Sequence, residues 1–121
     1  AFCVALQRAG VKFGKALPVL DLGLTDDPSA FATRTIVLDA QHAGEFGGTG
    51  RTVPWPIARD LVERYPDLRF VLAGGLSPDN VADAIALIRP FGVDTTTGVE
   101  NAPGQKDHGK LRAFIAAARG A

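Results

Sequence analysis

Two stretches in the last third of the chain decide its fold: RFVLAGG at residues 69–75 and GVDTTTGVE at residues 92–100. Each is typical of an apolar strand that ends in glycine. Glycine lets backbone N–H groups come close to an anion, and a helix that begins just after a strand adds the positive end of its dipole. The loops after the last two strands of a (β/α)-barrel often bind phosphate. The two stretches therefore predict a cradle for a small phosphorylated metabolite.

Strand-like and helix-like segments alternate along the whole chain. We expect strands at residues 11–19, 35–39, 69–73 and 93–97, helices at residues 2–9, 54–65 (or 56–65), 81–88 and 110–119, and a short helical segment at residues 28–32. This alternation requires a parallel sheet with right-handed crossovers, as in an open doubly wound sheet or a (β/α)-barrel. Glycine or polar residues at the end of every strand favour the barrel. One helix followed by four βα units is half of a (β/α)8 TIM barrel, so we expect an α/β half-barrel.

The composition is that of a globular protein, since 46% of the 121 residues are hydrophobic and the net charge is zero. The balanced charge and the absence of a Lys/Arg cluster argue against a nucleic-acid binder. The longest apolar runs are strand-sized and no secretory signal is recognisable, so we expect no membrane span and a cytoplasmic protein. One cysteine excludes an internal disulfide, and two histidines without partner cysteines predict no metal site.

The sequence contains no methionine and opens on AFCVAL, already in helical rhythm and without a capping residue. This start predicts a fragment of a longer protein, and an uncapped helix left after methionine removal is the alternative. Phe2, Leu6 and Ala9 suit one face of the first helix, which Gly10 ends as a C-cap. On the same helix, Cys3 is expected to be a small buried side chain rather than a nucleophile.

Two aspartates are candidates for chemistry. Asp39 closes a strand of Ile, Val and Leu, at the rim where barrel enzymes hold their catalytic groups. Partial desolvation there would raise its pKa and make it a general acid, whereas a strand-end Asp that caps a loop N–H is the alternative. Asp94 either points into the barrel toward a ligand or lies at the start of its strand and caps a neighbouring loop.

The long loop at residues 40–53 contains GGTGRT at residues 47–52. It lacks the Gly-Lys pair of a Walker motif and the third glycine of a Rossmann fingerprint, so nucleotide binding is disfavoured. We expect a lid or substrate-facing loop, with a plain flexible loop as the alternative. Just after it, Trp55 between two prolines is expected to be a packing anchor at a helix entrance.

Several motifs, in this order and spacing, resemble the phosphoribosylanthranilate isomerase family. They are IVLD at residues 36–39, GGTGRT at 47–52 followed by Trp55, LAGGLSPDNV at 72–81, RP at 89–90 before GVD at 92–94, and GVE at 98–100 leading to PG at 103–104 and KD at 106–107. Together they cover essentially the whole chain, whereas any one of them alone would be weak.

The resemblance implies a single-domain (β/α)8 barrel, of which residues 1–121 are the C-terminal half. It implies the Amadori rearrangement of N-(5′-phosphoribosyl)anthranilate in tryptophan biosynthesis, without a cofactor. It also implies a role for each matched position. On this resemblance, Asp39 is the general acid that protonates the furanose ring oxygen, and Asp94 lines the pocket. The phosphate is bound around Gly74, Gly75, Thr97, Gly98 and Val99. The loop formed by Gly47, Gly48, Thr49 and Gly50 covers the anthranilate end.

The family's general base is a cysteine at the end of the first barrel strand, a segment that this sequence does not contain. Cys3 lies in what the resemblance makes the fourth helix, so it is not that base. We therefore expect no activity without the missing N-terminal half, and either that half or a second copy as the partner. The alternative is a non-catalytic half-barrel module that binds sugar phosphates and self-associates.

Overall fold

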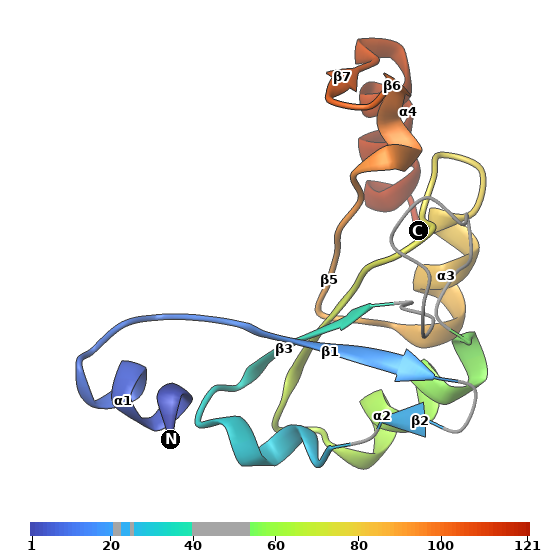
Figure 1. Cartoon of the computed structure of the whole chain (residues 1–121). Coiled ribbons are helices and arrows are strands. Elements are labelled where there is room, and N and C mark those ends of the chain that lie inside the picture. Colours follow the sequence, from blue (N-terminus) through green and yellow to red (C-terminus); the bar gives the residue numbers. More distant parts are fainter. Residues whose placement is uncertain (21–22, 25, 40–53) are drawn as a thin grey trace.

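A computed structural model describes residues 1–20, 23–24, 26–39 and 54–121 (Figure 1). Its elements, in chain order, are α1 (Phe2–Arg8), β1 (Lys15–Leu20), β2 (Gly23–Leu24), the 3-10 helix η1 (Pro28–Phe31), β3 (Thr35–Asp39), α2 (Trp55–Arg64), β4 (Arg69–Leu72), α3 (Val81–Ile88), β5 (Gly92–Val93), the 3-10 helix η2 (Thr97–Val99), β6 (Glu100–Ala102), β7 (Gln105–Lys106) and α4 (His108–Arg119). Within these ranges, no helix has both the length and the apolar character that crossing a membrane requires.

One mostly parallel sheet organises the molecule. Its strand order is β2-β1-β3-β4-β5, and the pairs β1–β3, β3–β4 and β4–β5 are parallel, as the alternating pattern predicts. The register places Leu17 beside Leu38 and Leu38 beside Leu72, so these side chains share one face. The short strand β2 pairs antiparallel with the end of β1 and was not predicted.

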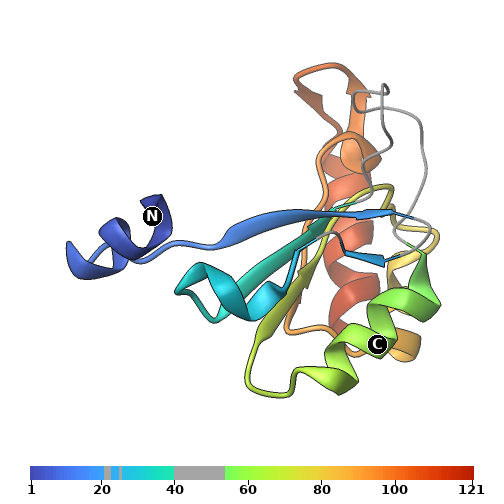
Figure 2. The same ribbon diagram turned by 60° about the horizontal axis from the view of Figure 1, so that its bottom comes forward.

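The core lies between this face of the sheet and the helices (Figure 2). Ile36, Leu38, Phe70 and Leu72 are at most 2% exposed because helices cover them. Helix α2 packs against α3, and α3 packs against α4. The helices contribute the buried side chains Ala58, Leu61, Val81, Ala84, Ile88 and Phe114. Trp55, predicted as a packing anchor, packs against this core.

The opposite face of the sheet is only partly covered. Val37 and Val71, which alternate with the core residues of β3 and β4, are half-buried, and Ala16 is exposed. An uninterrupted apolar run such as IVL at residues 36–38 is typical of a strand covered on both faces. Among the described residues only one face of the sheet is covered, because the helices that are described pack on one side. A valine at such a position suits a covered face and an open one equally, so the run could not distinguish them.

Several predicted boundaries are corrected by local hydrogen bonds. Strand β1 begins at Lys15 rather than residue 11, because the Val11 N–H still donates to the Leu6 carbonyl at 3.0 Å and belongs to the helix end. Strand β5 is only Gly92–Val93 rather than 93–97, because the chain turns into η2. Helix α4 begins at His108 rather than 110, since the Asp107 carboxylate accepts the Lys110 N–H at 2.9 Å.

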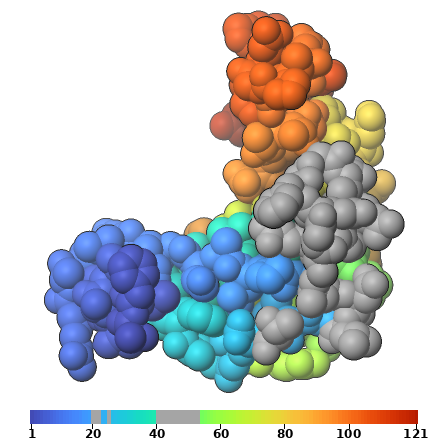
Figure 3. Space-filling view, viewed as in Figure 1, coloured from blue at the N-terminus to red at the C-terminus, as the bar shows by residue number. Residues whose placement is uncertain are grey.

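Helix α1 lies apart from the rest of the molecule, and Figure 3 shows it as a separate lobe. None of its residues is buried, Phe2 is 75% exposed, and Cys3 is only half-buried. The helix was predicted correctly, but the expected burial of Cys3 was wrong, because α1 meets no second layer in the described part of the chain.

Candidate functional site

The carboxyl ends of β3, β4 and β5 meet at one edge of the sheet. Asp39 is the last residue of β3 and is half-buried. The Ala73 N–H, just after β4, donates to the Leu38 carbonyl at 2.8 Å, and the Asp94 N–H, just after β5, donates to the Leu72 carbonyl at 2.9 Å. The loops that follow these three neighbouring strands therefore begin at a common edge of the sheet, which we call the rim. The rim carries Asp39 and the first residues of both glycine loops.

The loop after β4 has a defined turn conformation that side-chain hydrogen bonds stabilise. Gly74 and Gly75 have φ angles of 90° and 69°, in the left-handed region that favours glycine. The Asn80 side-chain amide donates to the Gly75 carbonyl at 3.0 Å, and its oxygen accepts the Ser77 N–H at 2.8 Å. Ser77, Asp79 and Asn80 are of the residue types that commonly cap a helix. The side chain of Asn80 in fact bonds backward and holds the glycine turn in place.

The loops after β4 and β5 are fastened together. The Thr95 hydroxyl donates to the Leu76 carbonyl at 2.7 Å. A Cβ atom on Gly98 would overlap with the same carbonyl oxygen and would lie 2.8 Å from the Thr95 hydroxyl oxygen. Glycine at position 98 is therefore required by packing between the two loops, whether or not an anion binds there.

The remaining candidates around η2 differ in what they expose. Val99 is 2% exposed and anchors η2 to the core, so only its backbone can face a ligand. Thr97 is exposed, and Gly98 is half-exposed. Asp94 is exposed and lies beyond the end of β5, not at the start of the strand as one interpretation had it. Gly47, Gly48, Thr49 and Gly50 lie outside the described residues.

Helix α4 is docked beside η2 through its first residues. The Asp107 N–H donates to the Val99 carbonyl at 2.8 Å, and the helix contacts η2. The hydrogen bond that the Asp107 carboxylate accepts from the Lys110 N–H lowers the pKa of that carboxyl. Asp107 is therefore ionised at neutral pH, as the N-cap of a helix prefers.

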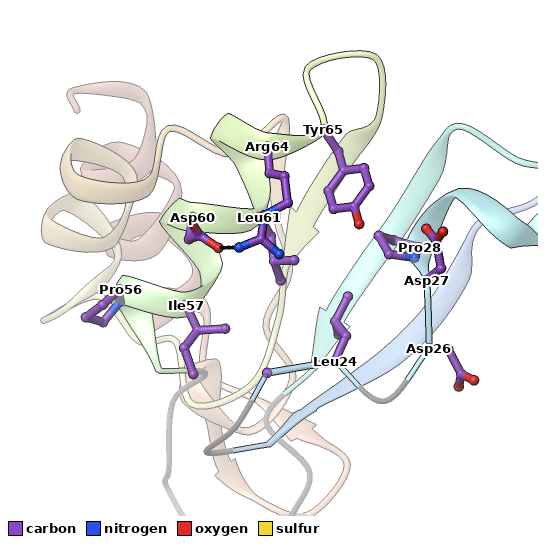
Figure 4. Close-up of a pocket in the computed structure, with 11 residues that line it drawn as sticks. Leu24, Asp26, Asp27, Pro28, Pro56, Ile57, Asp60, Leu61, Arg64 and Tyr65 are labelled. Atoms are coloured by element: carbon purple, nitrogen blue, oxygen red, sulfur yellow. Dashed lines mark hydrogen bonds and ion pairs between the residues drawn. The ribbon is translucent and has the colours of Figure 1, made fainter.

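A recess of about 540 Å³ lies elsewhere, between α2 on one side and β2 and the start of η1 on the other (Figure 4). Tyr65 at the end of α2 and Pro28 of η1 face each other across it, and Arg64 forms an ion pair with Asp60 on its wall. None of the residues that line it is a predicted site residue. The candidate site is the strand rim, and this recess is a separate feature.

The model of the family described as N-(5′-phosphoribosyl)anthranilate (PRA) isomerase matches residues 6–117. The chain belongs to this family. The isomerase of Cellvibrio japonicus is 44% identical over 98% of this chain and 53% of its own length. The crystal structure of the isomerase from Thermotoga maritima superimposes with a TM-score of 0.75 at 37% identity, over 98% of this chain and 58% of that one.

A further solved isomerase of the family carries a bound ligand. It is 32% identical, with a TM-score of 0.69 over 98% of this chain and 55% of that one, and it was solved with reduced 1-(o-carboxyphenylamino)-1-deoxyribulose 5-phosphate. The chain spans about half the length of the curated relatives it matches. The resemblance seen in the motifs is thus confirmed at the level of family and α/β fold.

Proposed function

We propose that this chain is the C-terminal half of a (β/α)8 barrel and that, joined to an N-terminal half, it catalyses the Amadori rearrangement of N-(5′-phosphoribosyl)anthranilate in tryptophan biosynthesis. The observation that carries the proposal is the shared rim, where the family's acid position Asp39 lies at the same sheet edge as the loops that follow β4 and β5. In barrel enzymes this edge is where catalytic residues and phosphate sites lie.

The half-covered sheet supports the half-barrel. In a closed barrel, one face of the sheet packs against the helices, and the other fills the interior with layers of side chains. The first face holds the buried core of this chain, and Val37 and Val71 on the second face are half-buried. These valines would form part of the barrel interior. An N-terminal half would bury them and pair with the outer strands of the sheet.

In the proposed mechanism the residues of this chain perform the ring-opening step. Asp39 donates a proton to the furanose ring oxygen as the C1′–O bond breaks, which gives the open-chain Schiff base. The base on the N-terminal half then removes the C2′ proton, and the resulting enolamine becomes the ketone of 1-(2-carboxyphenylamino)-1-deoxyribulose 5-phosphate. No cofactor enters this sequence of steps.

The same proposal assigns binding roles to the other matched residues. Backbone N–H groups of Gly74, Gly75 and Thr97–Val99 bind the 5′-phosphate, since left-handed glycines and a tight turn present such donors. The loop at residues 47–50 covers the anthranilate end, and Asp94 lines the pocket. The ligand of the solved relative, which carries both a 5-phosphate and a carboxyphenyl group, supports these two subsites.

Complementation tests this proposal. The chain is mixed with the separately produced N-terminal half of the Cellvibrio japonicus isomerase, and conversion of N-(5′-phosphoribosyl)anthranilate is followed by its fluorescence. We expect turnover from the mixture and none from either half alone. Turnover by this chain alone would overturn the half-barrel, and a mixture that binds tightly yet stays inactive would overturn the enzymatic role.

The partly covered sheet face also favours a second candidate, a non-catalytic half-barrel that binds sugar phosphates and associates with itself. Such a module would bind inorganic phosphate as a dimer and would gain no activity from any N-terminal half. Sedimentation of the isolated chain, together with the complementation assay, separates the two functions.

A further inference from the structure

Glu100, just after η2, carries a buried carboxylate with defined partners. Its side chain is only 6% exposed. One carboxylate oxygen accepts the Gly104 N–H at 2.6 Å, and the other lies 3.5 Å from the Lys106 ammonium. Gly104 has a φ of 78°, so the tip of the β6–β7 hairpin adopts a conformation that suits glycine. Neither Glu100 nor Lys106 has a role in the function proposed above.

Lys106 connects this carboxylate to the turn before η2. Its ammonium donates to the Thr96 carbonyl at 3.0 Å while remaining paired with Glu100. The Thr96 carbonyl belongs to the same peptide group as the Thr97 N–H. In a trans peptide these two groups point in opposite directions. A cation that holds the carbonyl therefore fixes the direction of the Thr97 N–H, and it also polarises that N–H as a hydrogen-bond donor.

We propose that Glu100 and Lys106 are positioning residues for phosphate binding, in which Glu100 holds Lys106 and Lys106 aims the Thr97 N–H at the phosphate group. This inference rests on the phosphate site of the proposed function. Neither side chain contacts the ligand. They act through one peptide group, and that group opens the turn Thr97–Val99.

The sign of one mutational effect separates positioning from simple electrostatics. Glu100 is an anion near a proposed anion site, so if only its charge mattered, the change Glu100→Gln would strengthen phosphate binding. If Glu100 positions Lys106, the same change weakens phosphate binding, because the ammonium is no longer held against the Thr96 carbonyl.

Lys110 supplies a matched control. Its ammonium also donates to a backbone carbonyl at 3.0 Å, but this carbonyl belongs to Glu100, after the turn. Lys106→Met and Lys110→Met therefore remove the same charge and the same kind of hydrogen bond from one small region. Only the first releases the peptide group that leads into η2. Lys106→Arg keeps a cation that can donate to the Thr96 carbonyl.

The test is equilibrium dialysis of the whole chain and its variants against radiolabelled inorganic phosphate, which works whatever the oligomeric state. We expect Glu100→Gln and Lys106→Met to raise the dissociation constant about five- to tenfold, the size of one lost charge-assisted hydrogen bond. Lys110→Met should stay within about twofold of the parent, and Lys106→Arg should recover most of the affinity. Thermal unfolding of each variant shows whether it is folded.

Each outcome has one meaning. If the parent chain binds no phosphate, both the proposed site and this inference fail. If the parent binds and Glu100→Gln binds equally or more tightly, the inference alone fails. The same holds if Lys110→Met weakens binding as much as Lys106→Met. Should Glu100→Gln not fold, Lys106→Met decides, because the Lys106 side chain is 45% exposed and its replacement leaves no cavity in the core.

Discussion

The two ends of this molecule differ in what holds them. At the carboxyl end, η2 is joined to the loop after β4 by the Thr95–Leu76 hydrogen bond, to the β6–β7 hairpin by Lys106, and to α4 through Asp107. At the amino end, α1 forms a regular helix but has no buried residue. A helical pattern thus predicts a helix, but only contacts with a second layer make it part of the fold.

Substitutions in the sheet and in α1 should show the difference between the packed and the unpacked part of the molecule most clearly. Leu72→Ala empties a site that is 1% exposed, and we expect it to cost about 3–4 kcal/mol of unfolding free energy. Phe2→Ala should stay within about 0.5 kcal/mol, since Phe2 is 75% exposed. Urea unfolding at one protein concentration measures both. Equal costs would mean that α1 is packed as firmly as the sheet.

A second pair of substitutions, at Gly98 and Gly92, tests how closely the loops after β4 and β5 pack against each other. Gly98→Ala should destabilise the chain by about 3 kcal/mol, because the new methyl group overlaps with the Leu76 carbonyl. Gly92→Ala should be tolerated, since its methyl group would only touch the Val71 side chain at 3.7 Å. The melting temperatures of both variants, without phosphate, test this. Similar melting temperatures would show that the loops after β4 and β5 are not in close contact.

A smaller effect is expected from removing the hydrogen bond that joins the same two loops. Thr95→Val keeps the shape of the side chain and removes the donor to the Leu76 carbonyl, at a cost of about 1 kcal/mol. Thr95→Ser, which keeps the hydroxyl, is the control and should lose less. Chemical denaturation measures the difference, and a Val variant as stable as the parent would contradict the role of this bond.

The smallest expected effect is a pH dependence at the start of α4. The Lys110 N–H lowers the pKa of Asp107 below its ordinary value, so the carboxylate binds its proton less readily in the folded chain. Its stabilising contribution is therefore present above the unfolded pKa, near 4, and is lost as the pH falls through the folded value. Between pH 6 and pH 3, Asp107→Asn should flatten the fall in melting temperature. An unchanged slope would exclude Asp107 as its source.

Local patterns predicted the parts of this fold that local forces determine. Strand β3 was predicted with its observed bounds, since an uninterrupted run of β-branched and leucine residues has little alternative. The glycines of the two rim loops were identified because glycine after a strand lets backbone N–H groups approach an anion. The structure gives Gly74 and Gly75 left-handed φ angles, whereas packing against the Leu76 carbonyl requires glycine at position 98. The end of β5 was missed, since it depends on a hydroxyl of Thr95 bonding to Leu76, 19 residues earlier in the chain.

The same distinction between local patterns and long-range contacts applies to the candidate site. Asp39 and the glycine loops were identified because position along a barrel and residue type both indicate a role. Asn80, Thr95 and Glu100 were missed as supporting residues, because their roles lie in contacts that periodicity does not reveal. The motif GVE with PG and KD downstream was the available signal for Glu100, and it pointed to the family without indicating a role. The predicted loop at residues 47–50 lies outside the described residues and stays a prediction.

The central claim, that this rim is the isomerase site, is tested most directly through the proposed general-acid role of Asp39. In the complemented enzyme, Asp39→Asn keeps the shape of the side chain and removes the proton that opens the ring, while Asp83→Asn on the exposed side of α3 is the control. We predict that Asp39→Asn lowers kcat by about 10²–10⁴-fold with little change in binding of the product analogue, and that the control stays near the parent. A loss of less than tenfold for Asp39→Asn would contradict the account.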